Sequence, residues 1–498
     1  MLMNKFRNII KGCALPLIRI LRYKSVVPVK MRDGYMQNKN LKYNNNRFYG
    51  PKKYFCYAPF GSMFISYNGK VSPCYACKAE ENLNNKTLQE IWTGAVFTGL
   101  RKHFQNGEIP DACSFCKNHL LQGNYGSILA NKYDHYLLSP TGKPVIAELE
   151  LSNKCHLECI MCSGSLSSSI REKREKLPPV TRMLPDDFMR QFTPFLEELK
   201  SLELTGGDPL LIDDYYQILS IAEKINPELD ILITTNANTF TQKVRELLNK
   251  KLRLSFNVSL DSLNEETYAQ IRRNGSLQKA IENIDRFAEY VNEHNTSLGF
   301  LVCPLKYNWK ELPHFVDFAN KYKATLSYHV VFKPAEHALW SFSSEILKEI
   351  ALYLKSFKFS SYDFNSRINV RSYKALVTLI ETWQLKASAR EQKQQQLHNE
   401  MMKSIDLAKK KVKENLNDDL MFDTLEKAIK NMKVLEYAGL VYIELAKKTK
   451  QEITNGIKTF SPLELERKMQ QYHSDVHAGF LYQVNLSDND KYMNNLAE

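Results

Sequence analysis

From about residue 145 to residue 332 the chain alternates short apolar runs with longer amphipathic stretches. Six runs are predicted strands: Val145–Leu151, Leu202–Thr205, Asp230–Thr235, Leu252–Leu260, Ser297–Cys303 and Thr325–Phe332. Helical periodicity lies between them, at about Asp186–Leu199, Asp213–Ile225, Thr241–Leu248, Glu265–Glu289 and Trp309–Tyr322. Alternation with helices of this length predicts parallel strands joined by crossovers, and six such strands suit an α/β fold with an open or partial barrel.

A smaller pattern precedes the predicted barrel. Tyr54–Ser66 and the residues around Val71 predict a hairpin that turns at Asn68-Gly69, a strong turn dipeptide. Lys86–Gln105 predicts an amphipathic helix. We therefore expect a small hairpin-plus-helix domain before the barrel.

After Pro334 the pattern is helical. Apolar-periodic segments occur at Ser344–Phe357, Ser372–Trp383 and Leu420–Lys448, with a Lys-, Glu- and Gln-rich segment at Ala387–Asn415. We interpret this part as a helical surface extension. The predicted organisation is an arm at 1–50, the hairpin domain at 51–125, a linker at 126–143, the barrel at 144–335 and the extension at 336–498.

The positive charge is concentrated in the arm. Residues 1–54 carry thirteen Lys and Arg side chains and one acid, Asp33, which accounts for nearly all of the net charge of +13. The body is close to neutral, which argues against a nucleic-acid partner, because such a surface should be basic along its groove.

Residues 1–24 also place apolar side chains at helical spacing among Lys and Arg. Two interpretations stay open: peripheral contact with an anionic membrane surface, or a helix that docks on the protein itself, which we favour. Ala14–Leu21 is too short to span a bilayer and nothing resembles a cleaved signal peptide. We expect a cytoplasmic protein.

Candidate chemistry begins with three cysteines directly after the first predicted barrel strand. Cys155, Cys159 and Cys162 form a C-x3-C-x2-C triplet. Three thiolates can hold three irons of a [4Fe–4S] cube and leave the fourth iron open to a ligand. The alternative is zinc, but a closed zinc site needs four protein ligands, and no fourth Cys or His follows closely.

A second cysteine set lies in the hairpin domain. Cys56 and Cys74 flank the predicted turn, Cys113 and Cys116 form a later Cys-x2-Cys pair, and Cys77 is an alternate candidate. Four thiolates without an open position fit zinc or a closed [4Fe–4S] cluster, and close pairs alone favour zinc slightly.

The triplet and the strand ends together resemble the radical S-adenosylmethionine (SAM) enzymes. Gly206-Gly207-Asp208-Pro209 follows the second strand, where that family carries Gly-Gly-Glu-Pro. The resemblance implies a partial (β/α)6 barrel, an open [4Fe–4S] cluster at the triplet, and SAM bound to it. The residues that it implies for SAM binding are Met161, Gly206, Gly207, Asp208, Asn236, Ser259, Asp261 and Arg272.

The upstream cysteines extend the resemblance. Their order, a Cys, then Gly-x4-Cys from Gly69 to Cys74, then Cys-x2-Cys, is similar to the SPASM or twitch domains that hold an auxiliary iron–sulfur cluster. In the family this domain normally follows the barrel, whereas here it precedes it, as in a group with an N-terminal twitch domain. The resemblance implies a second [4Fe–4S] cluster held by Cys56, Cys74, Cys113 and Cys116.

The activity that the resemblance implies is reductive cleavage of SAM to a 5′-deoxyadenosyl radical that abstracts hydrogen from a substrate. The electron would come from a flavodoxin or ferredoxin, and the auxiliary cluster would accept the leftover electron, giving net oxidation. Three hypotheses stay open: oxidation of a small molecule such as a sugar, maturation of a peptide, and a non-catalytic scaffold with zinc at both sites. No catalytic acid or base is predicted.

Overall fold

The computed structural model describes residue 30 and residues 34–123, 125–430, 442, 445–446 and 449–453. The chain divides into two compact units. One comprises Met1–Ser341 with Ile350–Leu379, and the other comprises Phe342–Glu349 with Ile380–Glu498. Both cysteine sets lie in the first unit.

A sheet of nine strands runs through the described part of the first unit, in the order β3-β2-β1-β4-β5-β6-β7-β8-β9. The strands are β1 (Ser62–Ser66), β2 (Lys70–Ser72), β3 (Glu81–Asn82), β4 (Ile146–Glu150), β5 (Ser201–Leu204), β6 (Asp230–Thr235), β7 (Arg253–Ser259), β8 (Leu298–Val302) and β9 (Thr325–Tyr328). Strands β4 to β9 pair in parallel with their neighbours in chain order. The predicted six-stranded partial barrel is therefore confirmed.

The hairpin domain is built onto the same sheet. β1 lies parallel to β4, from Ser62 opposite Ile146 to Ser66 opposite Glu150. β2 and then β3 continue antiparallel from β1. The turn between β1 and β2 places Gly69 at φ +75°, so the predicted hairpin turn is confirmed. The first arm, predicted over Tyr54–Ser66, is shorter than expected, because residues 58–61 form a short helix and the strand begins only at Ser62. What the sequence did not indicate is that β1 is a parallel neighbour of the first barrel strand.

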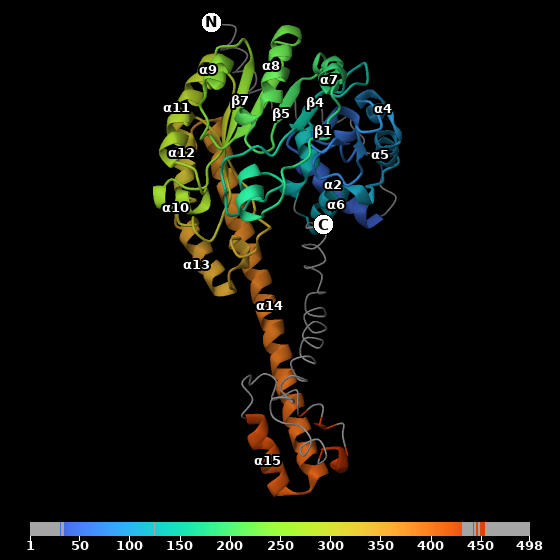
Figure 1. The fold of residues 1–498 in the computed structure, drawn as a ribbon, viewed down its shortest axis with the longest axis vertical. Helices are drawn as coiled ribbons and strands as arrows, with labels where there is room; N and C mark the ends of the chain where they lie inside the picture. Colours follow the sequence, from blue (N-terminus) through green and yellow to red (C-terminus); the bar gives the residue numbers. More distant parts are fainter. Residues whose placement is uncertain are drawn as a thin grey trace. The chain divides into compact units, whose positions relative to one another are not determined.

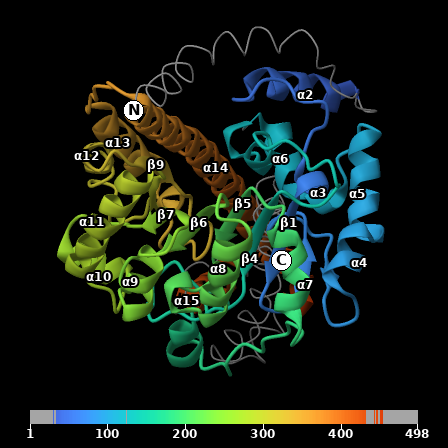
Figure 2. The same cartoon turned by 90° about the horizontal axis from the view of Figure 1, so that it is seen from above.

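Helices cover one face of the barrel strands. They are α7 (Phe188–Leu196), α8 (Asp213–Ile225), α9 (Gln242–Leu248), α10 (Glu265–Ile271), α11 (Leu277–His294) and α12 (His314–Lys321). Figure 2 shows α9 to α12 around the outside of β6, β7 and β9. β7 illustrates the packing, because Phe256 is fully buried and stacks on Phe287 of α11 with ring centroids 4.3 Å apart.

The opposite face of β7 is polar. Ser255, Asn257 and Ser259 alternate with the buried apolar residues and are partly exposed. Barrel interiors are ordinarily filled by bulky aliphatic side chains. A polar, partly exposed inner face therefore leaves room for something other than a packed core.

Two predicted helices are each broken in two. Lys86–Gln105 divides into α4 (Leu88–Thr93) and α5 (Ala95–Gln105), because Gly94 adopts an extended conformation between them. Glu265–Glu289 divides into α10 and α11 at Asn274-Gly275, where Asn274 has φ +66° and Ser276 caps the second helix. The apolar period continues across both breaks, so periodicity alone predicted single helices.

The helix predicted over Trp309–Tyr322 starts late. Residues 309–312 form turns, and α12 begins only at His314, after Pro313. Proline suits the first turn of a helix and not its interior.

The hairpin domain has its own core around the second cysteine set. It contains α2 (Gly34–Asn46), α3 (Ala58–Gly61) and α6 (Ser114–Gln122), in addition to α4 and α5 (Figures 1 and 2). Tyr43 of α2 is buried against Phe55, with ring centroids 5.4 Å apart. The arm predicted at 1–50 therefore ends in a helix that packs on this domain, whereas the amphipathic segment predicted at residues 1–24 lies outside the described residues.

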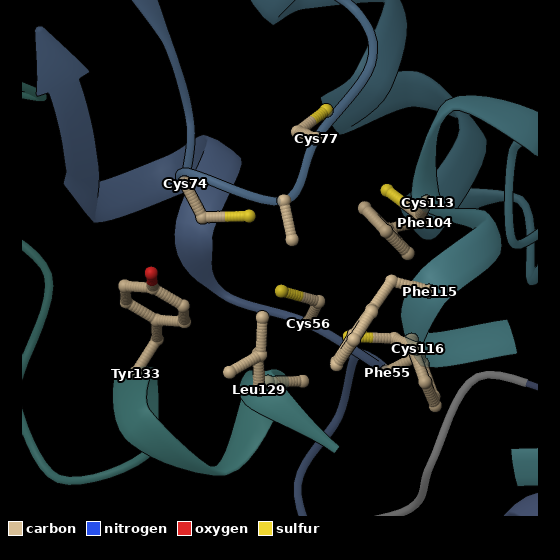
Figure 3. Close-up of a pocket in the computed structure, with 12 residues that line it drawn as sticks. Phe55, Cys56, Cys74, Cys77, Phe104, Cys113, Phe115, Cys116, Leu129 and Tyr133 are labelled. Carbon is tan, nitrogen blue, oxygen red and sulfur yellow. The ribbon is translucent and has the colours of Figure 1, made fainter. Parts of the chain in front are cut away.

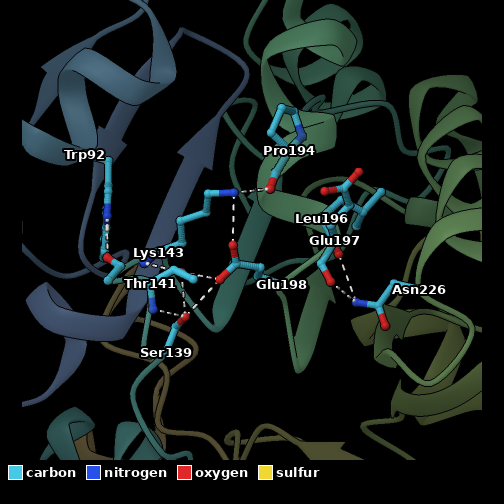
Figure 4. Close-up of polar contacts among 10 residues, drawn as sticks. Trp92, Ser139, Thr141, Lys143, Pro194, Leu196, Glu197, Glu198 and Asn226 are labelled. Carbon is cyan, nitrogen blue, oxygen red and sulfur yellow. Dashed lines mark hydrogen bonds and ion pairs between the residues drawn. The ribbon is translucent and has the colours of Figure 1, made fainter.

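The linker at 126–143 is tied to both neighbours (Figure 4). The Glu198 carboxylate after α7 accepts from Ser139 Oγ at 2.8 Å and from Thr141, and it pairs with Lys143 Nζ at 3.0 Å. On the other side, Trp92 Nε1 of α4 donates to the Gly142 carbonyl at 2.9 Å. The linker is thus an ordered connection.

The second unit is helical where it is described. The segments predicted separately at Ser372–Trp383 and Ala387–Asn415 form one helix, α14 (Phe364–Leu416), which begins in the first unit. In the second unit Val412 and Leu416 of α14 pack with Phe422 and Leu425 of α15 (Asp419–Lys430). The helical extension is confirmed, including α13 (Ser344–Lys355). In the part of the chain that the structure describes, no helix is long and apolar enough to cross a membrane.

Candidate functional site

The cysteine triplet occupies the loop that leaves the carboxyl end of β4. The loop is bonded to the chain after α10, through Glu158 N–H to the Arg273 carbonyl and Ile160 N–H to the Ile271 carbonyl, both at 2.9 Å. Arg174 donates to the carbonyl oxygens of Cys159 and Cys162. Reacting groups of parallel α/β barrels lie at this edge of the sheet, so the triplet is placed as the sequence predicted.

Two of the three sulfurs receive a side-chain N–H. Asn236 Nδ2 lies 3.8 Å from Cys155 Sγ, and Arg272 Nη1 lies 3.9 Å from Cys159 Sγ. Burial raises the pKa of Cys155 to about 11 and that of Cys159 to about 12, and the neighbouring thiols add to both shifts. Thiols buried together in this way become thiolates when a positively charged group binds them, which fits an iron–sulfur cluster.

Gly206 and Gly207 pack against the cysteine loop itself. A Cβ at Gly206 would lie 2.5 Å from the Ser152 carbonyl oxygen, and one at Gly207 would lie 2.2 Å from that of Lys154. Gly206 also has φ +82°. Any side chain here would displace the segment that leads into Cys155. The two glycines are therefore needed for close packing against the cysteine loop, in addition to any close approach of the backbone to SAM.

Asp208 is fully buried and its carboxylate is already bonded. One oxygen accepts from Thr235 Oγ1 at 2.7 Å and the other from Thr239 Oγ1 at 2.8 Å. Burial raises the pKa of this carboxyl. In this structure the side chain joins the ends of β5 and β6, and its predicted role in SAM binding would fall to the backbone.

Asp261 and Arg272 form a buried ion pair, with Oδ2 and Nη2 2.7 Å apart. The other oxygen of Asp261 accepts from Cys303 N–H at 2.7 Å. Ser259, at the end of β7, is half-buried on the polar face. Met161 packs beside Cys303 in a small apolar cluster. The structure thus brings the predicted SAM-binding residues to the same edge of the sheet as the triplet, but it pairs two of them with each other.

The second cysteine set lines one pocket of the hairpin domain (Figure 3). All five candidates, Cys56, Cys74, Cys77, Cys113 and Cys116, contribute to its wall, together with aromatic and aliphatic side chains. No three His, Cys, Asp or Glu side chains among the described residues converge on a point that a single metal ion would occupy. The thiols are instead spread around the wall.

The pocket leaves the fifth cysteine unassigned. The side chains of Cys77 and Cys113 shift each other's pKa, lowering that of Cys77 and raising that of Cys113, and Cys77 N–H donates to the Cys74 carbonyl at 3.1 Å. Burial raises the pKa of Cys56 well above its usual range. Cys77 was predicted as an alternate ligand to Cys74. In the structure it is also next to Cys113, so it is a candidate to replace either of these two ligands.

A charged network that the sequence did not indicate lies beside this pocket. Tyr133, a pocket residue from the linker, donates from its hydroxyl to Glu148 Oε1 of β4 at 2.6 Å. Lys132 Nζ pairs with Glu148 at 2.9 Å and with Glu203 of β5 at 2.7 Å. Burial favours neutral Lys132, but the two carboxylates outweigh it and raise its pKa above the usual range. Only the alternation of Glu148 with apolar residues hinted that a partner was needed.

Glu150, two residues further along β4, has a different environment. It has no hydrogen bond or ion pair to any other described side chain, and burial raises its pKa to about 7. A Cβ at Gly206 would lie 3.0 Å from its Cγ, which places Glu150 beside the loop after β5, at the carboxyl end of β4 where the triplet loop begins.

Two family models match this chain. The radical SAM superfamily matches residues 149–319, and the iron–sulfur cluster-binding SPASM domain matches residues 56–117. The chain therefore contains a radical SAM domain preceded by a SPASM domain, whose cofactors are a [4Fe–4S] cluster with SAM and an auxiliary iron–sulfur cluster. The matches favour iron–sulfur clusters over zinc at both cysteine sets.

Individual relatives are more distant. The chain is 26% identical over 198 residues to a GTP 3′,8-cyclase of Clostridium botulinum, covering 36% of this chain and 54% of the relative. It is 33% identical over 139 residues to a GTP 3′,8-cyclase of Paenarthrobacter nicotinovorans, covering 28% of this chain and 37% of the relative. The chain thus spans about half or less of the length of these relatives.

Solved structures are similar at low identity. SuiB of Streptococcus suis bound to S-adenosylmethionine matches with a TM-score of 0.33 and 18% identity, over 52% of this chain and 59% of that chain. Native anSMEcpe with bound AdoMet matches with a TM-score of 0.32 and 14% identity, over 42% and 59%. Similarity at this level carries no argument about substrate or reaction.

Proposed function

We propose that this radical SAM enzyme oxidises a polar small molecule such as a sugar, with the auxiliary cluster as the acceptor of the leftover electron. The observation that carries the proposal is that β1 joins the domain of the second cysteine set to the first barrel strand, side by side in one sheet. When bound, the cluster and SAM supply a radical that abstracts hydrogen. A second redox centre on the same sheet supports removal of a second electron.

The residues of this chain would ligate the two clusters and position the substrate. Cys155, Cys159 and Cys162 would ligate the SAM cluster. Cys56, Cys74, Cys113 and Cys116 would ligate the auxiliary cluster, with Cys77 as the alternate. Asn257 and Ser259 offer hydrogen bonds on the inner face of β7, which supports a polar substrate, whereas the Ser255 hydroxyl is bonded to Ser297.

The relatives' name raises a nucleoside triphosphate as another candidate. The charges on β4 and β5 argue against it, because the charged residues of these two strands are the acids Glu148, Glu150 and Glu203, and Lys132 already pairs with two of them. A triphosphate would meet like charge there. A peptide substrate stays as an outcome of the test below.

The first experiment establishes the clusters and radical formation. Anaerobically purified protein should hold about eight irons with matching sulfide and should form 5′-deoxyadenosine from SAM and a reductant. Cys159→Ala should abolish the 5′-deoxyadenosine. Cys13→Ala is the matched control, since Cys13 lies outside both sets. Stoichiometric zinc in place of iron would overturn the proposal.

A second experiment addresses the substrate and the oxidation. Sugars, amino sugars and peptides are screened for SAM-dependent loss of two hydrogens by mass spectrometry. The Cys113→Ala variant should still form 5′-deoxyadenosine but lose the oxidised product. A peptide as the only oxidised substrate would replace the small-molecule proposal, and full product yield without the auxiliary cluster would remove the electron-acceptor role.

A further inference from the structure

The Arg272 guanidinium is held at a fixed orientation beside one predicted cluster ligand. Its side chain is 8% exposed, with Nη2 2.7 Å from Asp261 Oδ2 and Nη1 3.9 Å from Cys159 Sγ. Nε has no partner among the described residues. Arg272 is the C-cap residue directly after α10, and its backbone N–H donates to the Tyr268 carbonyl at 2.7 Å.

Asp261 is fixed in turn by the end of β8. Its Oδ1 accepts from Cys303 N–H at 2.7 Å, and its carbonyl accepts from Asn308 Nδ2 at 2.6 Å. Asp261 is fully buried. The Asp261 carboxylate is thus held by the Cys303 N–H on one oxygen and by the Arg272 guanidinium on the other. This arrangement fixes the direction in which Nη1 of Arg272 points.

The three sulfurs of the triplet therefore differ in what faces them. Cys159 receives an N–H from a cation, and Cys155 receives one from the neutral amide of Asn236 at 3.8 Å. In the described contact of Cys162 the sulfur is the donor, from its S–H to the Ser163 carbonyl, with 3.7 Å between sulfur and oxygen. Arg174 is the other guanidinium at this loop, but it bonds carbonyl oxygens and not sulfur.

A charged donor on a thiolate ligand favours the more negative state of a cluster. Hydrogen bonds to the ligand sulfurs and nearby charge are among the factors that set the reduction potential of iron–sulfur clusters. Arginine keeps its proton at any ordinary pH, so the contribution is permanent. The buried position keeps solvent from screening it.

We propose that Arg272, oriented by Asp261, is a positioning residue that raises the reduction potential of the SAM cluster through its contact with Cys159. The step affected is the uptake of one electron by the oxidised cluster from an external reductant, in which no bond forms or breaks. The proposal rests on a cluster at the triplet, and it is independent of the substrate and of the net oxidation proposed above.

The test is a reductive titration of the full-length, anaerobically prepared protein, followed by electron paramagnetic resonance. The relevant signal is the one that Cys159→Ala removes. Arg272→Met should lower the midpoint potential by 59 mV or more, which is a tenfold or greater loss in the reduction equilibrium of a one-electron couple. Arg272→Lys should restore part of the shift, because it returns the charge without the planar fork.

Two further variants separate the electrical effect from a structural one. The first is the double variant Arg272→Met with Asp261→Asn, which removes the charge on Asp261 together with that on Arg272 and so leaves no unpaired carboxylate buried. Its midpoint potential should still be below that of the wild type. Arg253→Met removes the matched Arg–Asp pair at the other end of β7, where Nε lies 2.8 Å from Asp230, and should leave the potential unchanged.

The outcomes are distinguishable from those of the proposed function. Unchanged potentials in both Arg272→Met variants would overturn the inference, and so would a loss of triplet iron in both. If the wild-type triplet holds no iron–sulfur cluster, the proposed function fails first.

Discussion

The two cysteine sites are built from opposite kinds of surroundings. The triplet lies in a loop held by backbone hydrogen bonds, and an amide and a guanidinium are directed at its sulfurs. The second site is a pocket with aromatic and aliphatic walls, and no charged side chain is among the described residues that line it. Polar surroundings suit an iron that exchanges ligands, whereas an apolar wall suits a cluster that only passes electrons.

The sharpest way to test this difference is to remove one ligand from each site. Cys159→Ala should abolish 5′-deoxyadenosine formation and remove about four irons. Cys116→Ala should also remove about four irons but leave 5′-deoxyadenosine formation within a few-fold of the wild type. Iron analysis and chromatographic detection of 5′-deoxyadenosine measure both. Equal loss of activity in the two variants would show that the sites do not divide the work in this way.

A glycine substitution should damage the triplet alone. Gly207→Ala would place a Cβ 2.2 Å from the Lys154 carbonyl oxygen and force the cysteine loop away, at a cost of about 1–3 kcal/mol or more. We expect loss of triplet iron while the auxiliary iron is kept. Gly99→Ala in α5 is the control, since nothing lies within 4 Å of its added Cβ. A Gly207→Ala protein with full iron and full activity would contradict the role assigned to this contact.

Glu150, at the carboxyl end of β4, should make stability depend on pH. Because its folded pKa of about 7 is above that of an unfolded glutamate, the folded state holds a proton that the unfolded state releases. Its contribution is complete below about pH 4.5 and disappears as the pH rises through 7.

Glu150→Gln should remove this dependence. Relative to the variant, the wild type should lose roughly 3 kcal/mol of unfolding free energy between pH 5 and pH 8. Anaerobic urea unfolding across that range measures the difference. Glu293→Gln on the exposed face of α11 should show none. A constant difference between wild type and Glu150→Gln would refute the assigned pKa.

Glu148, which lies on the same face of β4 as Glu150 but bonds Tyr133 of the auxiliary pocket, should stabilise the fold as a charged carboxylate. Its carboxylate is bonded to Tyr133 and Lys132, so Glu148→Gln should cost about 1–3 kcal/mol at neutral pH, with Glu203 still pairing Lys132. The exposed pair of Lys70 and Glu80 provides the control, and Glu80→Gln should cost under about 1 kcal/mol. The urea midpoints of unfolding at pH 7 measure both costs. Equal shifts in the Glu148→Gln and Glu80→Gln variants would count against a stabilising role of the network of Lys132, Tyr133, Glu148 and Glu203.

Much of this arrangement could be predicted from local pattern. Six parallel strands, the hairpin turn at Gly69 and the place of the triplet all follow from alternation, turn residues and spacing within short windows. Periodicity failed where a single residue interrupts a continuing pattern, at Gly94 and at Asn274. The continuous helix α14 was also missed, because its charged middle breaks the apolar period without breaking the helix.

Long-range partners could not be predicted in the same way. Lys132 and Tyr133 lie in a segment that looks like a plain linker, and their partners on β4 and β5 are up to 71 residues away. The pairing of Asp261 with Arg272 has the same origin, since each residue alone resembled a SAM contact. Which polar side chains bond each other depends on the order of strands in the folded sheet, and no short window of sequence contains that information.

The pairing of β1 with β4 has a consequence for how this protein can be divided. Without β1, the five residues of β4 from Ile146 to Glu150 would present unpaired N–H and C=O groups along an open sheet edge. Such an edge recruits strands from other molecules and leads to aggregation. A barrel truncated at residue 144 would therefore be difficult to keep in solution. A chimaera that takes its hairpin domain from a relative would have to keep β1 and its pairing register with β4.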